Sequence, residues 1–433
     1  MYQVEASKAL LKPRLWAGRA ARLRVPRNVV MLGMVSLLTD VSSEMVATVL
    51  PLYLVFSLGA SPLVFGAIDG TYGGAAALVQ VASGFVSDRW RRPKGVAGLG
   101  YGLSAVGKVA LVGAGNTIGG IGAIIAVDRV GKGIRTAPRD ALISLSSAKD
   151  RLATSFGVHR AMDSVGAMLG PLVAFGILFV APARFDAVFV VSTLFAVLGL
   201  AVLILNVDGR PQRLRRAERG EAAPADADAD DKAAPSFRAA LGLLAAPRFA
   251  PLLIAAGLLS VASVSDAMIY VGLQRNIDFD PAVFPLLYVM TAIVFMGLAI
   301  PFGQLADRVG KVPVLLGGQA LLFVTYGVLM MGSVGYGALV LCLLALGGYF
   351  AATEGVLTAL AGTVLPEKLQ ASGIGLLITV TSLGRLASSL AFGGLWFAIG
   401  LQSAVICFVA ALALAMMLAA PLLLRAQRAA LDG

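Results

Sequence analysis

Charged side chains inside apolar segments are the residues of this chain whose types and spacing suit chemistry. Asp40 and Glu44 lie four residues apart, so on a helix their carboxylates stack on one face. On another helix, six charged residues would fall within a sector of about 140°: Asp128, Arg129, Lys132, Arg135, Arg139 and Asp140. Such groups can bind ions or exchange protons, and the simplest arrangement pairs the acidic helix with the basic one.

Two interpretations of these charges stay open at this point. In one, Asp40 and Glu44 titrate because a guanidinium such as that of Arg129 moves towards or away from them. In the other, the charges form a static lattice of ion pairs that only holds the helices together. An ionised group in a bilayer costs at least about 2.5–3.5 kcal/mol, so in both cases these side chains are expected to face protein or water.

Further charged residues lie in other apolar segments. His159, Arg160 and Asp163 are close together in one of them, and a single histidine is more typical of packing and hydrogen bonding than of proton transfer. Asp69 is expected near the outer end of its helix, where capping or solvation is a simpler explanation than chemistry. The second half of the chain adds the candidate residues Asp266, Glu354 and Arg385.

The composition indicates which medium surrounds the chain. Of its 433 residues, 58% are hydrophobic and 14% are charged, against about 45–50% and about 25% in soluble domains. This excludes a water-soluble enzyme and makes lipid the expected surroundings. Two cysteines and one histidine provide neither a disulfide framework nor a multi-histidine metal site. We expect no metal, no cofactor and no enzymatic activity, because the spans carry no catalytic Ser/His arrangement.

Hydropathy predicts an all-α polytopic membrane protein with twelve transmembrane helices. They cover residues 29–56, 63–87, 95–115, 118–144, 152–180, 185–206, 249–274, 284–306, 312–332, 335–362, 370–398 and 401–424. The fourth is unusual, since its uninterrupted apolar stretch runs only from Ile118 to Val127 before the charges begin.

The lysine and arginine residues outside the spans predict the orientation of the chain. If all twelve segments cross, the N-terminal arm, the central loop and the C-terminal tail share one side, and only Arg184 and Arg275 lie on the other. We therefore expect a multi-pass protein of the inner, cytoplasmic membrane with both termini in the cytoplasm. The net charge of +11 then reflects orientation, and no nucleic-acid partner is expected.

A polar, low-complexity stretch at residues 221–231 divides the chain in two. The predicted parts are a basic arm (1–28), a six-helix bundle (29–206), a disordered cytoplasmic linker (207–248), a second six-helix bundle (249–424) and a cytoplasmic tail (425–433). The halves repeat each other at an offset of about 220 residues: Gly84, Asp88 and Arg89 match Gly303, Asp307 and Arg308, while Gly157 and Gly166 match Gly375 and Gly384. This predicts two bundles related by a pseudo-twofold axis along the membrane normal, with a cavity between them.

These motifs resemble those of the major facilitator superfamily (MFS), whose members are twelve-helix secondary transporters. The stretches 84–89 and 303–308 are similar to its loop motif, which in the family latches the outward-open state through charge contacts at the cytoplasmic mouth. The stretch 129–133 resembles a second motif, whose arginine is linked to proton transfer. The stretches 40–45 and 131–140 further resemble a largely uncharacterised prokaryotic branch of the superfamily.

A glycine pattern on the fifth helix extends the resemblance to drug/proton antiporters. It consists of Gly157, Gly166, Gly170 and Pro171. Small residues at this spacing allow helices to approach closely, and the proline lets the helix bend. Ordinary helix packing is the alternative explanation, whereas the resemblance implies export.

The resemblance implies a transporter that works by alternating access. Our first hypothesis is a monomeric, proton-coupled antiporter that exports a small organic compound, with Asp40 and Glu44 handling the proton. The alternative is a proton-coupled importer of an anionic metabolite, which the arginine-rich inner half of the cavity also permits. A non-transporting membrane receptor is a remote third possibility. The expected partners are the lipid bilayer, a small-molecule substrate and protons.

Overall fold

The structure of the chain, a computed structural model, describes residues 25–90, 92–147, 152–209, 242–277, 279–331, 335–365 and 369–431. Within these ranges the chain is almost entirely helical and contains no β-strand, which confirms the predicted all-α fold. Most of the predicted basic arm and most of the predicted linker lie outside the described residues.

The first half of the chain forms six long helices. They are α2 (Arg27–Pro51), α3 (Pro62–Trp90), α4 (Pro93–Gly113), α5 (Ile118–Ser146), α6 (Leu152–Val180) and α7 (Phe185–Asn206). A π-helical segment, Leu52–Ser57, continues α2 beyond its proline. The weakly apolar fourth segment is thus one continuous helix, α5, despite its six charged residues.

The second half repeats this order. Its helices are α11 (Ala250–Val261), α12 (Asp266–Ile277), α13 (Phe284–Val309), α14 (Lys311–Met330), α15 (Tyr336–Val364), α16 (Gln370–Ile399) and α17 (Leu401–Leu431). Short 3-10 turns, Leu243–Ala245 and Pro281–Val283, precede α11 and α13.

Most of these helices are long and apolar enough to cross a membrane. Ten candidate spans meet that criterion among the described residues. The other two long helices, α3 and α5, have 29 residues each, which exceeds the roughly 20 that a bilayer requires. They pack against spanning helices and against each other, so the fold holds twelve spans when α11 and α12 count as one.

Helix contacts show that the two halves are built alike. In the first half α2 packs on α6 and α7, α5 on α3 and α4, and α4 on α7. In the second half α11 packs on α16 and α17, α15 on α13 and α14, and α14 on α17. Each contact of the first half therefore recurs at the equivalent helices of the second, as two six-helix bundles related by a pseudo-twofold axis require.

Matching glycines hold equivalent helix pairs together. A Cβ at Gly166 would overlap the carbonyl oxygen of Leu37, so α6 touches the backbone of α2 there. A Cβ at Gly384 would lie 2.7 Å from the Cβ of Ser260, and α16 meets α11 in the same manner. Gly157 differs, because nothing lies within 4 Å of its Cβ position. The glycine pattern is thus a packing feature at Gly166 but not at Gly157.

The predicted seventh span, residues 249–274, is confirmed as a candidate span at Ala250–Ile277, but two helices form it. It breaks between Val261 and Asp266, where α11 ends and α12 begins. The Tyr326 hydroxyl compensates the break, since it accepts from the Val264 amide at 2.9 Å and donates to the Ala262 carbonyl at 3.1 Å. Freed backbone groups inside a membrane need such partners, and here a side chain from α14 provides them.

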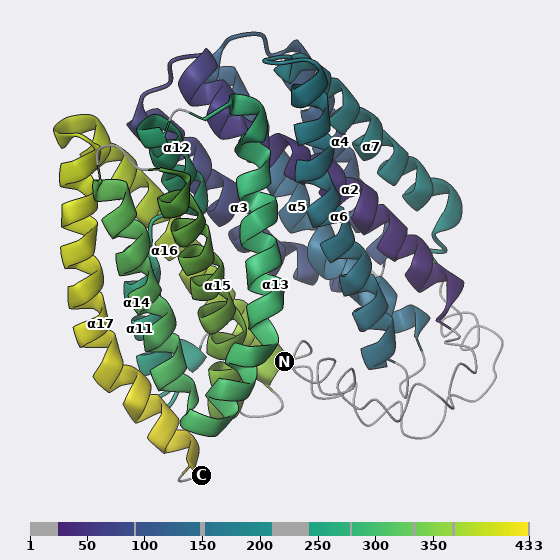
Figure 1. The fold of residues 1–433 in the computed structure, drawn as a ribbon. Coiled ribbons are helices and arrows are strands. Elements are labelled where there is room, and N and C mark those ends of the chain that lie inside the picture. Colours follow the sequence, from purple (N-terminus) through teal and green to yellow (C-terminus); the bar gives the residue numbers. More distant parts are fainter. Residues whose placement is uncertain are drawn as a thin grey trace, which may run out of the picture.

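The halves meet at one end of the molecule and separate at the other (Figure 1). Their most extensive contact joins residues 62–74 of α3 to residues 386–393 of α16. We call the end of the molecule with this contact the closed end. The segment that connects α2 to α3 also lies there. At the opposite end, which we call the open end, the Arg160 side chain is 63% exposed. The side chains of Glu354 and Arg385 lie between the two ends and are 47% and 50% exposed.

Replacing Gly166 by valine should lower the thermal stability of the protein. The added side chain collides with the backbone of α2, and overpacking of this kind costs about 1–3 kcal/mol. We expect the melting temperature in detergent, followed by fluorescence-detected size exclusion, to fall by several degrees. Gly157→Val is the matched control, because its Cβ position is open. Equal losses in both variants would contradict the packing role of Gly166.

Candidate functional site

Three charged residues are completely buried in the first bundle. Lys108 of α4 and Asp128 and Arg129 of α5 are each 2% exposed or less. One Asp128 oxygen, Oδ2, accepts from the Lys108 Nζ at 3.4 Å and from the Arg129 guanidinium. The Arg129 guanidinium also lies 3.7 Å from the centre of the Tyr72 ring on α3. This cluster ties three helices together around one carboxylate and carries an excess of one positive charge.

A second group of charges joins α2 to α5 and α6. The Arg135 guanidinium lies 3.9 Å from an oxygen of Asp40, donates to Ser104 at 3.3 Å and covers the ring of Tyr101. The Asp40 and Asp163 carboxyl groups lie within hydrogen-bonding distance of each other. Two carboxylates approach so closely only when they share a proton or when cations compensate their charge. The expected pairing of the acidic first helix with the basic fourth holds for Asp40.

Arg139 completes this group nearer the open end. It donates to Asp140 at 3.0 and 2.9 Å and to the Ser36 hydroxyl at 3.2 Å. Ser36 in turn donates to Asp163 at 2.7 Å, and Arg139 lies 3.9 Å from the same carboxylate. The hydroxyl thus bridges a guanidinium on α5 to a carboxylate on α6, while Arg160 flanks Asp163 at 3.4 Å.

His159 and Lys132 lie beside these groups. His159 is 2% exposed, and its Nε2 has no hydrogen-bond partner among the described residues. Lys132 is half-buried on α5. These two residues are therefore close to the charged cluster without an ion pair of their own within the described parts of the chain.

A pocket at the closed end lies between the two halves. Its lining includes three carboxylates, Glu44 of α2, Asp69 of α3 and Asp266 of α12, and the rings of Tyr72 and Tyr288. Glu44 and Asp266 come from equivalent positions of the repeat. The sequence suggested that Glu44 pairs with a basic residue of the fourth helix. Among the described residues Glu44 forms no ion pair within 4 Å, and it lines this pocket instead. The site is therefore acidic and aromatic, with both bundles contributing.

Asp69 is the residue of this pocket that sequence reasoning misjudged. It lies in the third turn of α3, so it is not a cap, and its Oδ2 accepts from the Ser389 hydroxyl of α16 at 2.8 Å. Glycines on either side, Gly66 and Gly70, let α16 approach at that level. A charged residue flanked by glycines four residues apart was the signal in the sequence for a helix contact at this point.

The second bundle contains one described ion pair that faces the space between the halves. Arg385 of α16 lies 3.4 Å from Glu354 of α15, and both side chains are about half exposed. The structure thus brings the predicted residues Glu354 and Arg385 together. The third predicted residue, Asp266, lines the pocket at the closed end.

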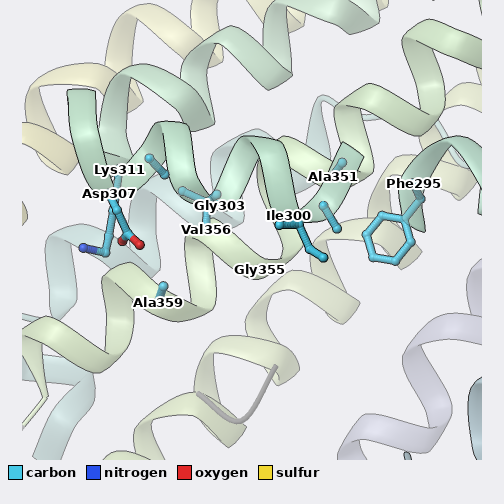
Figure 2. Close-up of a pocket in the computed structure, with 11 residues that line it drawn as sticks. Phe295, Ile300, Gly303, Asp307, Lys311, Ala351, Gly355, Val356 and Ala359 are labelled. Carbon is cyan, nitrogen blue, oxygen red and sulfur yellow. The ribbon is translucent and has the colours of Figure 1, made fainter. Parts of the chain in front are cut away.

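The repeated loop motif falls at the open end. Figure 2 shows Asp307 and Lys311 at one end of a second pocket between α13 and α15, with Phe295 at the other. Nothing lies within 4 Å of a Cβ at Gly303, so no other helix approaches closely at this glycine. Arg308 is exposed. The first copy, formed by Gly84, Asp88 and Arg89, lies in a part of α3 outside the residues whose side chains the structure describes.

Two bundles of spanning helices, with charged residues and a pocket between them, define a secondary transporter. The family model of the Major Facilitator Superfamily matches residues 32–389. The chain belongs to the major facilitator superfamily.

A relative from an archaeon agrees with this assignment. The chain is 30% identical over 381 residues to an uncharacterised MFS-type transporter of Methanocaldococcus jannaschii, covering 86% of this chain and 88% of that protein. It is 35% identical over 191 residues to an uncharacterised protein of Mycobacterium tuberculosis, covering 44% and 46%.

The fold is also similar to solved transporters. The nucleoside transporter NupG superposes with a TM-score of 0.71 at 14% identity, covering 92% of this chain and 98% of that one. A bacterial homologue of the human lysosomal transporter Spinster, inward-facing and unoccupied, gives 0.71 at 14% identity, covering 93% and 97%. At such identities the likeness shows the fold alone.

We expect the buried cluster of Lys108, Asp128 and Arg129 to tolerate the loss of one cation better than the loss of its carboxylate. Lys108→Met leaves the neutral pair of Asp128 and Arg129, so we expect a loss below about 1 kcal/mol. Asp128→Asn leaves two buried cations without a counter-charge and should cost about 3 kcal/mol or more. Thermal denaturation of the purified variants measures both. If Lys108→Met destabilised the protein as much as Asp128→Asn, the cluster would need both cations, and the prediction would be wrong.

Proposed function

We propose that this protein is a proton-coupled antiporter that exports a small organic compound across the cytoplasmic membrane by alternating access. Asp40, Glu44 and Asp163 are the proton-handling residues, and Arg135 and Arg139 move relative to them during the cycle. The protein works as a monomer, with both termini in the cytoplasm. Membership of a transporter family argues against enzymatic activity.

The contact between Asp40 and Asp163 is the observation that carries the proposal. These carboxyl groups belong to α2 and α6 and lie within hydrogen-bonding distance, with Arg135 and Arg139 each 3.9 Å from one of them. Moving either guanidinium away favours uptake of a proton by the pair, and its return favours release. The static lattice is the competing explanation, and it predicts no change of protonation during transport.

Glu44 lies between this pair and the pocket at the closed end. Glu44 lies one helical turn beyond Asp40 on the face of α2 and lines the pocket between the halves. A proton moving between pocket and open end therefore meets Glu44, Asp40 and Asp163 in order. The side chains of Asp40 and Asp163 are 12% and 20% exposed, which supports access from the open end.

The orientation of the charges supports an inward-facing state. The basic residues expected in the cytoplasm lie at the ends of helices at the open end, for example Arg27 at the start of α2 and Arg428 in the last turn of α17. The open end then faces the cytoplasm. Export as the direction of transport follows from the glycine pattern on α6 and its resemblance to antiporters.

Import of an anionic metabolite is the second candidate, and Arg160 favours it because its side chain is 63% exposed at the open end. The pocket at the closed end argues against it. Three carboxylates line that pocket, whereas Arg129, Arg135 and Arg139 are engaged with acidic partners elsewhere.

A transport assay in inverted membrane vesicles tests the proposal. A thermal-shift screen against a metabolite and antibiotic library first selects a compound that binds. Added outside vesicles with an acidic interior, that compound should discharge the pH gradient, followed by quinacrine fluorescence. We expect Glu44→Gln and Asp40→Asn each to reduce the discharge at least about tenfold.

Asp186→Asn is the control, because Asp186 is exposed and pairs with Arg184 at the closed end. It should discharge the gradient like the unmodified protein. Normal discharge by both Glu44→Gln and Asp40→Asn would refute the proton role. Compound-driven acidification of the vesicle interior would instead indicate symport.

A further inference from the structure

Asp69 connects the two halves directly at the closed end. Its Oδ2 accepts from the Ser389 hydroxyl of α16 at 2.8 Å. Ser389 is 2% exposed. One carboxylate of the first half is thus held by a hydroxyl group of the second half.

Glycines bring the two helices into backbone contact around this hydrogen bond. A Cβ at Gly66 would overlap the Ser389 carbonyl oxygen, and one at Gly70 would lie 2.7 Å from the Leu386 side chain. From the other helix, a Cβ at Gly393 would overlap the Pro62 carbonyl oxygen. Glycines at 66, 70 and 393 therefore form a tight seam at the closed end, and Asp69 and Ser389 supply its polar contact.

The chemistry of this contact differs from that of the other buried carboxylates. Asp128, Asp40 and Asp163 each have a basic partner, whereas Asp69 has no ion pair among the described residues. Arg385, one turn before Ser389, pairs with Glu354 instead. Hydrogen bonds from hydroxyls to a carboxylate are weaker than a buried ion pair, so this contact can form and break in each cycle.

We propose that Asp69 and Ser389 form the latch that holds the closed end shut. The latch keeps α3 against α16 while the open end is accessible, and it must separate before the pocket can open in the other direction. Asp69 also lines the pocket with Glu44 and Asp266, so a charge entering the pocket acts on the latch itself. The inference assumes alternating access but neither proton coupling nor a particular substrate.

Cysteine labelling from each side of the membrane tests the latch without any substrate. The natural Cys342 and Cys407 are replaced by serine, and Ala47→Cys in the pocket lining serves as the reporter. A membrane-impermeant maleimide is added to right-side-out and to inverted vesicles. The closed side is the one from which the reporter reacts slowly when the latch is intact.

Breaking the latch should raise labelling from the closed side. We expect Ser389→Ala and Asp69→Ala each to increase that rate about tenfold or more, since a hydrogen bond to a charged group shifts a two-state equilibrium by this amount. Asp69→Asn retains an oxygen that accepts from Ser389 but loses the charge, so its rate should lie between the intact rate and that of Asp69→Ala. Gly66→Ala, which separates the helices, should also increase labelling.

Two controls separate the latch from general destabilisation. Ser388→Ala removes a neighbouring buried hydroxyl that donates to Ser263 within the same half at 2.6 Å. Gly73→Ala adds a methyl group to α3 where nothing lies within 4 Å. Both should label as the unmodified reporter does, and size exclusion verifies that every variant is folded.

The proposal is overturned if Ser389→Ala and Gly66→Ala label from the closed side no faster than Ser388→Ala and Gly73→Ala. It is equally overturned if all four variants label faster together. Failure of proton coupling in the transport assay leaves these rates unchanged, so the two proposals fail separately.

Discussion

The cost of placing charge in lipid is the constraint on which this structure depends. Six charged residues on α5 could not face the bilayer, since each would cost at least about 2.5–3.5 kcal/mol there. The fold turns them inward, where Asp128 lies between Lys108 and Arg129 and Arg135 meets Asp40. The arrangement of α2, α4 and α6 around α5 follows from this need, because these helices supply most of the partners.

The two halves share a helix arrangement but differ in the polar features that they carry. The first bundle carries the ion pairs of α2, α5 and α6, whereas the second contains one described ion pair facing the interior, Arg385 with Glu354. In place of charge, the second bundle has a broken helix, stabilised by the Tyr326 hydroxyl. Asp266 begins the helix that follows the break and faces the pocket opposite Glu44. The same scaffold therefore carries ion pairs in the first half and a broken helix in the second half.

Close helix approach and reversible separation both occur at the contact of α3 with α16. Glycines permit van der Waals contact over a long stretch, which is favourable only while the helices are aligned. Among the described residues, the side-chain hydrogen bond that joins these two helices runs from the Ser389 hydroxyl to Asp69. A strong ion pair at this contact would hold one conformation, whereas hydroxyl contacts leave the energies of two conformations close enough for exchange.

The sequence by itself determined the number of spans, their repeat and the family motifs, because hydropathy and spacing are local properties. It also predicted that α2 and α5 face each other. Only the tertiary structure decided the partner of each charge. Asp69 and Ser389 are 320 residues apart, and Glu44 and Asp266 belong to different halves, so no local pattern could show that they meet. The break after Val261 likewise depends on Tyr326, a residue of another helix that compensates the lost backbone hydrogen bonds.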